Sequence, residues 1–251
     1  MKIKKISIVT VTYNCKHKLI KTLNSIVCKS SSIWVEHIFI DAVSTDGTLE
    51  VIDKYCSNSQ YDTEILSEKD YGIYDALNKA TEISSGDFIL LLHSGDSLNL
   101  SLDEIIEDIE TNQNFDFICF SGIFSKGNIK SNWSRHDYQL SIYNPALRHP
   151  CILIRRETLN YFNGYDLSYK ISADYHLISR YFQDDNLIKK IAIVDKFLIE
   201  MEVFGFSDNI SNFFLKKKEH LKIIRGAKFN SKKVKFYLRI FKQFISFIFK
   251  F

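Results

Sequence analysis

The sequence predicts an α/β fold built on a doubly wound, mostly parallel sheet. Short apolar runs alternate with amphipathic helical patterns over the first 120 residues, and this order is typical of parallel strands joined by crossover helices. The run FILLL at 88–92 is apolar throughout, as expected for a strand buried on both faces. A chain of 251 residues that is 45% hydrophobic can form one large domain with an appendage.

The elements of the first half follow from local patterns. Apolar residues at 19, 20, 23, 26 and 27 form one face of a helix over 15–28. The turn residues Ser44-Thr45-Asp46-Gly47 precede a helix over 48–55. We expect further helices at 73–83 and 102–112, and strands at 6–11, 37–40, 64–66, 88–92 and 115–120.

The second half is less regular. Residues 121–150 are polar and too long for a plain connection, which favours a functional loop. After this loop we expect a strand at 151–155, a helix at 172–182, and strands at 191–194 and 197–203.

Polar side chains follow four of the expected strands. They are Thr10 to Asn14, then Asp41 with Ser44 and Asp46, then Glu68 to Asp70, and last Ser94-Gly95-Asp96. Ligands of open α/β sheets bind beyond the carboxyl ends of the strands. A lone carboxylate there, such as Asp96, can hold a divalent cation against a diphosphate. Ordinary turn residues before a helix are the alternative for Ser94 to Asp96.

The ordered segments SIVTVTYN, FIDAVSTDGT, SEKDYGIYDALNKA and GDFILLLHSGDSL resemble the N-terminal half of family 2 glycosyltransferases. RHPCILIRRETL and FNGYDLSYKISADYHL resemble the acceptor-side region of the same family. The resemblance spans roughly residues 5–205, and four motifs in order are more specific than any one alone. It is strongest to bacterial members that build O-antigen (lipopolysaccharide), capsule or exopolysaccharide. It implies the GT-A fold, a Rossmann-like sheet.

The resemblance also implies an inverting hexosyl or N-acetylhexosaminyl transfer from a nucleotide-sugar. By this resemblance the nucleobase and ribose lie against Thr10, Tyr13, Asn14 and Asp41, and the donor pocket includes Asp70 and Asn78. Ser94 and Asp96 fall on the DxD motif, where Asp96 would bind Mn²⁺ or Mg²⁺. Asp174 falls on the position of the catalytic base. UDP is our default nucleotide because a carboxylate at Asp41 suits uracil, while GDP and dTDP stay open.

Several alternatives stand beside these roles. Asp41 and Asp174 could be a turn cap and a helix N-cap, and Tyr13 could be a core aromatic. Arg148 and His149 could contact the donor or the acceptor, although a lone histidine is more often structural than a metal ligand. The reduced DxD leaves metal dependence open, and a degenerate nucleotide-sugar-binding protein is a second candidate. A nucleotidyltransferase is a third candidate, without the glycine-rich loop that it needs after the first strand.

Charge divides the chain into a catalytic domain at 1–211 and a tail at 212–251. The catalytic domain comprises a donor half, 1–100, and an acceptor half, 115–211. The tail carries twelve Lys or Arg residues and one acid, Glu219, so its net charge is +11 against −8 for the rest. Residues 236–251 have the spacing of a basic amphipathic helix, which favours association with an anionic membrane surface. Packing on the catalytic domain or on a second subunit is the alternative.

The expected partners follow from this organisation. They are a nucleotide-sugar donor and a lipid-linked saccharide acceptor; we expect no nucleic acid, because the tail has no recognised nucleic-acid module. Five cysteines without a CxxC spacing indicate reduced thiols. We find no signal peptide and no run of 18 apolar residues. We therefore expect a cytoplasmic protein, peripheral on the inner face of the plasma membrane.

Overall fold

The computed structural model describes residues 6–29, 34–126, 129–133, 149–202 and 210–226. The strands are β1 Ile6–Thr12, β2 Val35–Asp41, β3 Asp62–Ser67, β4 Phe88–Leu91, β5 Ser97–Leu98, β6 Phe117–Lys126, β7 Ile129–Trp133, β8 Ile152–Arg155 and β9 Ile191–Glu202. The helices are α1 Lys16–Asn24, α2 Thr48–Asn58, α3 Ile73–Ile83, α4 Leu102–Thr111, α5 Arg156–Tyr161, α6 Ala173–Gln183 and α7 Ile210–Gly226, with a short 3₁₀ turn at His149–Cys151.

One mixed sheet organises these elements, in the order β3-β2-β1-β4-β8-β6-β9-β5, with β7 paired to β6. The strands β3, β2, β1 and β4 are parallel, and β6 is parallel to β9. The pairs β4–β8, β6–β8, β6–β7 and β5–β9 are antiparallel. The predicted α/β sheet is therefore confirmed, and its first half is purely parallel.

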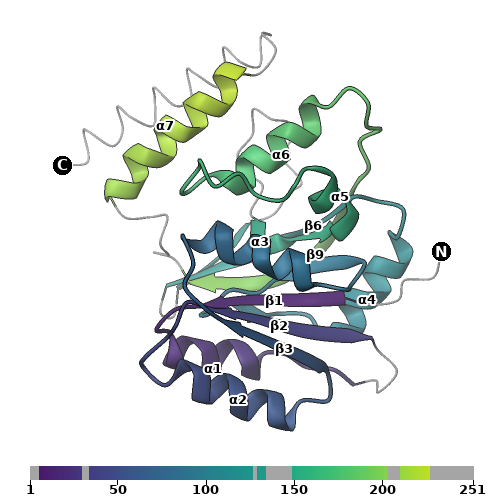
Figure 1. The fold of residues 1–251 in the computed structure, drawn as a ribbon. Coiled ribbons are helices and arrows are strands. Elements are labelled where there is room, and N and C mark those ends of the chain that lie inside the picture. The colour runs from purple at the N-terminus through teal and green to yellow at the C-terminus, as the bar shows by residue number, and fades with distance from the viewer. Residues whose placement is uncertain (1–5, 30–33, 127–128, 134–148, 203–209, 227–251) are drawn as a thin grey trace.

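Helices cover both faces of the sheet, as a doubly wound fold requires. Ile89 and Leu91 of β4 join a buried cluster with residues of α3 and α6, whereas Phe88 and Leu90 join a cluster with residues of α4. This division follows from the alternation of side chains along a strand. Figure 1 shows α1 and α2 together on one side of β1–β3 and α3 on the other side.

The register of the parallel half brings the strand ends to one edge. Thr12 of β1 pairs with Asp41 of β2, and Asp41 pairs with Ser67 of β3. The segment after β4 begins beside β1, because Leu92 N–H donates to the Val9 carbonyl at 2.9 Å. The polar groups predicted at the strand ends therefore share this edge.

The second half differs from the expected loop at 121–150. β6 continues to Lys126 and pairs with β7. The predicted strands at 191–194 and 197–203 form a single strand, β9, because its pairing with β6 continues through irregular register around Ser121 and Gly122. The polar pair Asp195-Lys196 therefore falls inside a strand. Residues 134–148, which include Arg148, lie outside the described part of the chain.

Helix α7 crosses the domain boundary that charge predicted after residue 211. Its Ile223 and Ile224 are buried in the same core cluster as Tyr175 of α6. Residues 210–226 thus pack on the rest of the described chain. The predicted amphipathic helix at 236–251 lies outside the described residues. None of the described helices is long and apolar enough to cross a membrane. The five cysteines all lie in the described residues, and none forms a disulfide.

Candidate active site

Asp41, at the end of β2, is the centre of a hydrogen-bond network at the carboxyl edge of the sheet. Its Oδ1 accepts from the hydroxyls of Thr12 (2.8 Å) and Ser44 (2.5 Å). Its Oδ2 accepts from Ser44 N–H (2.8 Å) and from the Ser67 hydroxyl (3.1 Å). These four bonds fill the acceptor positions of a carboxylate. A nucleobase N–H that binds Asp41 must therefore replace one of the hydroxyls.

The Thr10 side chain lies inside the sheet, two residues before the end of β1, and its role in donor binding stays a prediction. Its side chain is fully buried. The Thr10 hydroxyl donates to the Leu92 carbonyl at 2.9 Å and lies 2.9 Å from His37 Nε2. Complete burial lowers the pKa of His37 to about 3, so this imidazole is neutral. Thr10 therefore links β1 to β2 and β4 inside the sheet.

Tyr13 and Asn14 form the exposed rim beside Asp41. The Tyr13 side chain is 65% exposed, so it is no core aromatic and its ring face is accessible. Asn14 has φ of 45°, a left-handed conformation that asparagine tolerates well. Its N–H donates to the Ser44 hydroxyl (2.9 Å), and its Oδ1 accepts from Thr45 N–H (2.8 Å). Asn14 thus fixes the turn after β2 against the end of β1.

Asp70 lies just before α3 and Asn78 lies within α3, and the two side chains have different partners. Asp70 Oδ1 accepts from Gly72 N–H at 2.9 Å and forms the turn that precedes the helix. The Asn78 amide donates to the Tyr165 carbonyl (2.9 Å) and accepts from Tyr165 N–H (2.7 Å). A Cβ atom at Gly164 would lie 2.3 Å from Asn78 Oδ1. Both amide atoms of Asn78 therefore bind protein, and its place in the donor pocket stays a prediction.

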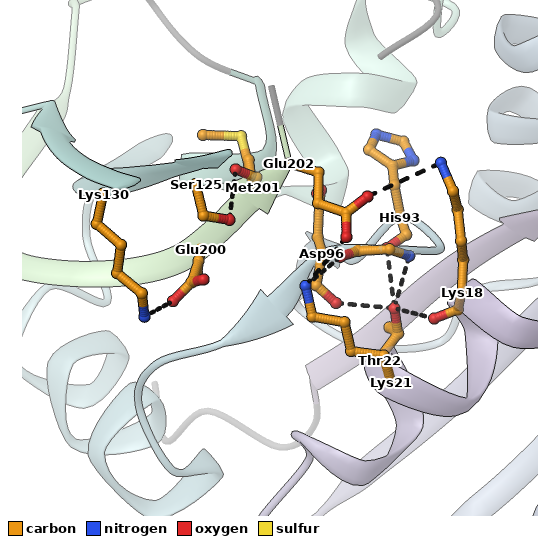
Figure 2. A network of polar contacts seen from close by, with 11 residues as sticks. Lys18, Lys21, Thr22, His93, Asp96, Ser125, Lys130, Glu200, Met201 and Glu202 are labelled. Atoms are coloured by element: carbon orange, nitrogen blue, oxygen red, sulfur yellow. Dashed lines mark hydrogen bonds and ion pairs between the residues drawn. The ribbon is translucent and has the colours of Figure 1, made fainter. Parts of the chain in front are cut away.

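The loop Ser94-Gly95-Asp96 rests on α1 (Figure 2). The Thr22 hydroxyl accepts from Gly95 N–H (2.9 Å) and donates to the Asp96 carbonyl (2.7 Å). The Ser94 hydroxyl accepts from the Cys15 thiol at 3.2 Å. The loop backbone is thus held by α1, which leaves the Asp96 side chain to face the site.

The Asp96 carboxylate receives no hydrogen bond from the described residues, although it is largely removed from solvent. Burial raises its pKa to about 7; Lys21 and Lys18 oppose this rise, while Glu202 adds to it. Lys21 Nζ lies 3.4 Å from Glu202 Oε1, and Lys18 Nζ lies 3.9 Å from Glu202 Oε2 (Figure 2). A second carboxylate and two ammonium groups therefore surround Asp96.

This environment fits one protein ligand for a divalent cation. A carboxylate without hydrogen-bond donors is stabilised by a cation or by a proton. No group of three metal-ligating side chains occurs among the residues that the structure describes. Diphosphate oxygens and water would therefore complete the coordination of Mg²⁺ or Mn²⁺, as is common for hard cations. Within the described part of the chain, His149 belongs to no group of three metal-ligating side chains.

Asp174 lies in the first turn of α6, where the helix dipole favours a negative side chain. The Tyr74 hydroxyl is 3.0 Å from Asp174 Oδ1 and 2.8 Å from the Ile171 carbonyl. Two histidines interact with the Asp174 charge. Burial lowers the pKa of His93 to about 4 and also lowers the pKa of His149, while Asp174 opposes both shifts. Burial therefore disfavours the charged form of both imidazoles.

Sequence reasoning missed several of these neighbours. Tyr74 and His93 lie inside the quoted motifs but were given no role, since only the tertiary structure brings them to Asp174. His149 was singled out, and its Nε2 lies 2.7 Å from the Tyr165 hydroxyl in a buried pair. Glu202 had no signal in the sequence, because the end of β9 reaches the Asp96 loop only through sheet pairing.

The comparisons with known proteins identify the family. Residues 7–184 match the family model described as Glycosyl transferase family 2. The chain belongs to this family. A PGL/p-HBAD biosynthesis glycosyltransferase of Mycobacterium bovis is 26% identical over 187 residues, 73% of this chain and 72% of that protein. The putative teichuronic acid biosynthesis glycosyltransferase TuaG of Bacillus subtilis is 31% identical over 91 residues, 36% of each chain. This glycosyltransferase therefore has relatives in polysaccharide biosynthesis.

Solved structures confirm the GT-A fold. S. aureus TarS 1-349 in complex with UDP aligns with a TM-score of 0.67 at 19% identity, over 97% of this chain and 72% of that one. The mannosyltransferase PcManGT of Pyrobaculum calidifontis, in complex with GDP-Man and Mn²⁺, gives a TM-score of 0.70 at 13% identity, over 96% and 70% of the two chains. At these identities the likeness concerns the fold alone.

Proposed function

We propose that this glycosyltransferase moves a sugar from a UDP-sugar to a hydroxyl of a lipid-linked saccharide, with inversion, during synthesis of a bacterial surface polysaccharide. One observation carries the proposal. The Tyr74 hydroxyl lies 3.0 Å from Asp174 Oδ1, and Tyr74 is in the first turn of α3, which follows β3 at the same edge of the sheet where the loop of Asp96 follows β4. The candidate base and the candidate metal ligand therefore share one edge of the sheet. The family match decides against a nucleotidyltransferase.

The roles of the donor-side residues follow from their exposure. Tyr13 offers an exposed ring for stacking on the base, and Asn14 with the Asp41 network shapes the nucleobase and ribose site. Asp96 would hold Mn²⁺ or Mg²⁺, which would offset the charge of the diphosphate leaving group. TarS with UDP and PcManGT with GDP-Man show that proteins of this fold take more than one nucleotide.

The transfer needs a base for the acceptor hydroxyl. Asp174 would take the proton from this hydroxyl as its oxygen attacks the anomeric carbon from the side opposite to the nucleotide. Tyr74 orients the Asp174 carboxylate. A positioned general base contributes roughly 10²–10⁴-fold to the rate.

The basic end of the chain supports association with a membrane. Residues 227–251 contain seven Lys or Arg residues and no acid, and each base near anionic lipid contributes about 1 kcal/mol. A peripheral position on the inner face of the plasma membrane would bring the site to a lipid-linked acceptor.

Calorimetric titration with UDP, GDP and dTDP, each with Mn²⁺ or with a chelator, tests the donor assignment. We expect tight binding of UDP that depends on Mn²⁺. Binding of another nucleotide alone would overturn UDP, and binding unaffected by the chelator would remove Asp96 from the proposed metal site.

Asp174→Asn tests the base. We expect donor binding to stay unchanged and transfer to fall roughly 10²–10⁴-fold, measured as nucleotide diphosphate release in the presence of acceptor. Asp185→Asn, at an exposed aspartate beyond the other end of α6, is the matched control and should keep wild-type rates. Normal turnover by Asp174→Asn would contradict the assignment.

A further inference from the structure

The segment just before Asp174 is held by a carboxylate from a distant part of the chain. Glu219, the only acid after residue 211, lies on α7 and is buried. Its Oε1 accepts from Lys170 N–H at 2.7 Å. Its Oε2 accepts from Ile171 N–H (3.1 Å) and Ser172 N–H (2.9 Å). Three consecutive backbone N–H groups thus converge on one carboxylate, the arrangement of an anion-binding nest.

This nest replaces the usual start of a helix. Ser172 is the N-cap residue of α6, but its side chain makes no capping hydrogen bond, and its hydroxyl is buried without a partner among the described residues. An N-cap side chain normally satisfies backbone N–H groups at this place. In this protein a charged group from another helix binds the backbone immediately before α6. Asp174 follows two residues after the last N–H that Glu219 holds.

The same segment is held from the other side by α3. The Tyr74 hydroxyl lies within hydrogen-bond distance of both the Ile171 carbonyl and Asp174 Oδ1. Ile171 therefore contacts Tyr74 through its carbonyl and Glu219 through its N–H. The backbone before Asp174 lies between two helices that are remote in sequence.

Helix α7 is docked firmly enough to act as such a support. Ile223 and Ile224 are buried in the core cluster. His220 packs on Tyr175 of α6 with ring centroids 4.7 Å apart, and Lys222 Nζ lies 4.3 Å from the centre of the Tyr169 ring. Figure 1 shows α7 beside α6.

We propose that Glu219 is a positioning residue for the transfer reaction: by binding the N–H groups of Lys170, Ile171 and Ser172, it sets the place of Asp174 relative to the acceptor hydroxyl. The inference rests on the proposed role of Asp174 as the base. Helix α7 then belongs to the catalytic unit, although composition groups it with the tail. Displacement of a reacting group by about 1 Å can cost on the order of 10²-fold in rate.

The test compares Glu219→Gln with two controls on α7. Gln has nearly the same shape, but its NH₂ group would face backbone donors, so at least one N–H loses its partner. We expect kcat to fall roughly 10–100-fold, while KM for the donor and calorimetric UDP affinity stay at the wild-type value. Hydrogen exchange should become faster in a peptide covering residues 168–175. Glu219→Asp should retain part of the rate, since it keeps the charge at a shorter reach.

The controls separate positioning from stability. Lys218→Ala changes an exposed side chain of the same helix and should change neither kcat nor exchange. Ile223→Ala weakens the packing of α7 without removing an acceptor from the nest. It should lower the melting temperature and keep kcat in the folded fraction. The proposal is overturned if Glu219→Gln keeps its kcat while exchange at 168–175 rises. It is also overturned if Glu219→Gln and Ile223→Ala both lose activity in proportion to their loss of stability.

A double variant provides an independent readout. Glu219→Gln and Tyr74→Phe each remove one of the two supports of the same segment. We expect the activity lost by the double variant to differ from the product of the single losses, because residues that share a partner are not additive. Multiplicative losses would show that Glu219 acts elsewhere. Failure of the base assignment itself would appear instead as normal turnover by Asp174→Asn, whatever Glu219→Gln does.

Discussion

Asp41 and Asp96 both follow strands of the parallel half, yet their surroundings differ completely. Asp41 is fully buried and accepts four hydrogen bonds. Asp96 is partly buried, and no described residue donates to its carboxylate; burial raises its pKa to about 7. One carboxylate is already satisfied by the protein, and the other is held in an environment that disfavours its charge.

The difference separates residues that build the edge of the sheet from residues that can accept a ligand. A carboxylate with four donors stabilises the structure around it. A carboxylate without donors costs stability when it is charged, and a bound cation would offset this cost. Asn78 belongs with Asp41 in this comparison, since both of its amide atoms bind backbone.

The largest expected effect is that of Asp41→Asn. The NH₂ group of Asn would face hydroxyl and N–H donors, so buried polar groups would lose their partners. We expect the free energy of unfolding to fall by about 3 kcal/mol, measured by urea denaturation, and UDP affinity to fall with it. Asp53→Asn, at an exposed aspartate on α2, is the control. Unchanged stability with lost UDP binding would instead make Asp41 a direct nucleobase contact.

Asn78→Ala should have the next largest effect. The substitution leaves the N–H and carbonyl of Tyr165 without their partners, which should lower the free energy of unfolding by about 1–3 kcal/mol. UDP affinity should remain unchanged in the folded protein, and titration with UDP measures this. Weaker UDP binding at unchanged stability would place Asn78 in the donor pocket.

The smallest expected effect is that of Asp96→Asn, which should raise the stability of the protein instead of lowering it. The pKa of Asp96 in the folded protein, about 7, lies above its ordinary value of 3.8. The folded state therefore holds a proton that the unfolded state has lost between these values, and ionisation of Asp96 lowers stability as the pH rises from about 4 to 7. Asp96→Asn removes this cost.

We expect Asp96→Asn to be more stable than the wild type by about 1–2 kcal/mol at pH 8, after allowance for partial exposure of the carboxylate. At pH 4 the gain should disappear. Mn²⁺-dependent UDP binding should be lost at pH 8, where Asp96 of the wild type is ionised. Thermal unfolding at the two pH values measures the first effect, with Asp53→Asn again as the control. A loss of stability at pH 8 would show that Asp96 is satisfied in solution.

The sequence was sufficient for the parallel half and for the edge where the site lies. Apolar runs such as 88–92 favour buried strands, and strand ends of a parallel sheet meet by geometry. Whether an individual side chain binds a ligand or the protein itself could not be predicted in the same way. Thr10 and Asn78 occupy family positions, but whether a hydroxyl or an amide faces a ligand or the backbone depends on neighbours such as Leu92 and Tyr165, which are distant in sequence.

The tail shows a second limit of prediction from sequence, which concerns domain boundaries. Five of its twelve basic residues lie on α7, so charge counting groups this helix with the segment that follows. Its packing depends instead on Ile223, Ile224 and Glu219. The two isoleucines carry no charge, and Glu219 changes the net charge by only one. A composition boundary can therefore cut through a helix that the core requires.

The contact between Asn78 and Gly164 links the donor half of the chain to the acceptor half, and this link matters for recombination. A side chain at position 164 would collide with the Asn78 amide, and the positive φ of 66° at Gly164 disfavours other residues there. Chimaeras that join the donor half of one relative to the acceptor half of another must transfer these two positions as a pair. A crossover point between residues 78 and 164 separates them, and where it brings a residue other than Gly to position 164 against Asn78, the two halves of the hybrid would not fit.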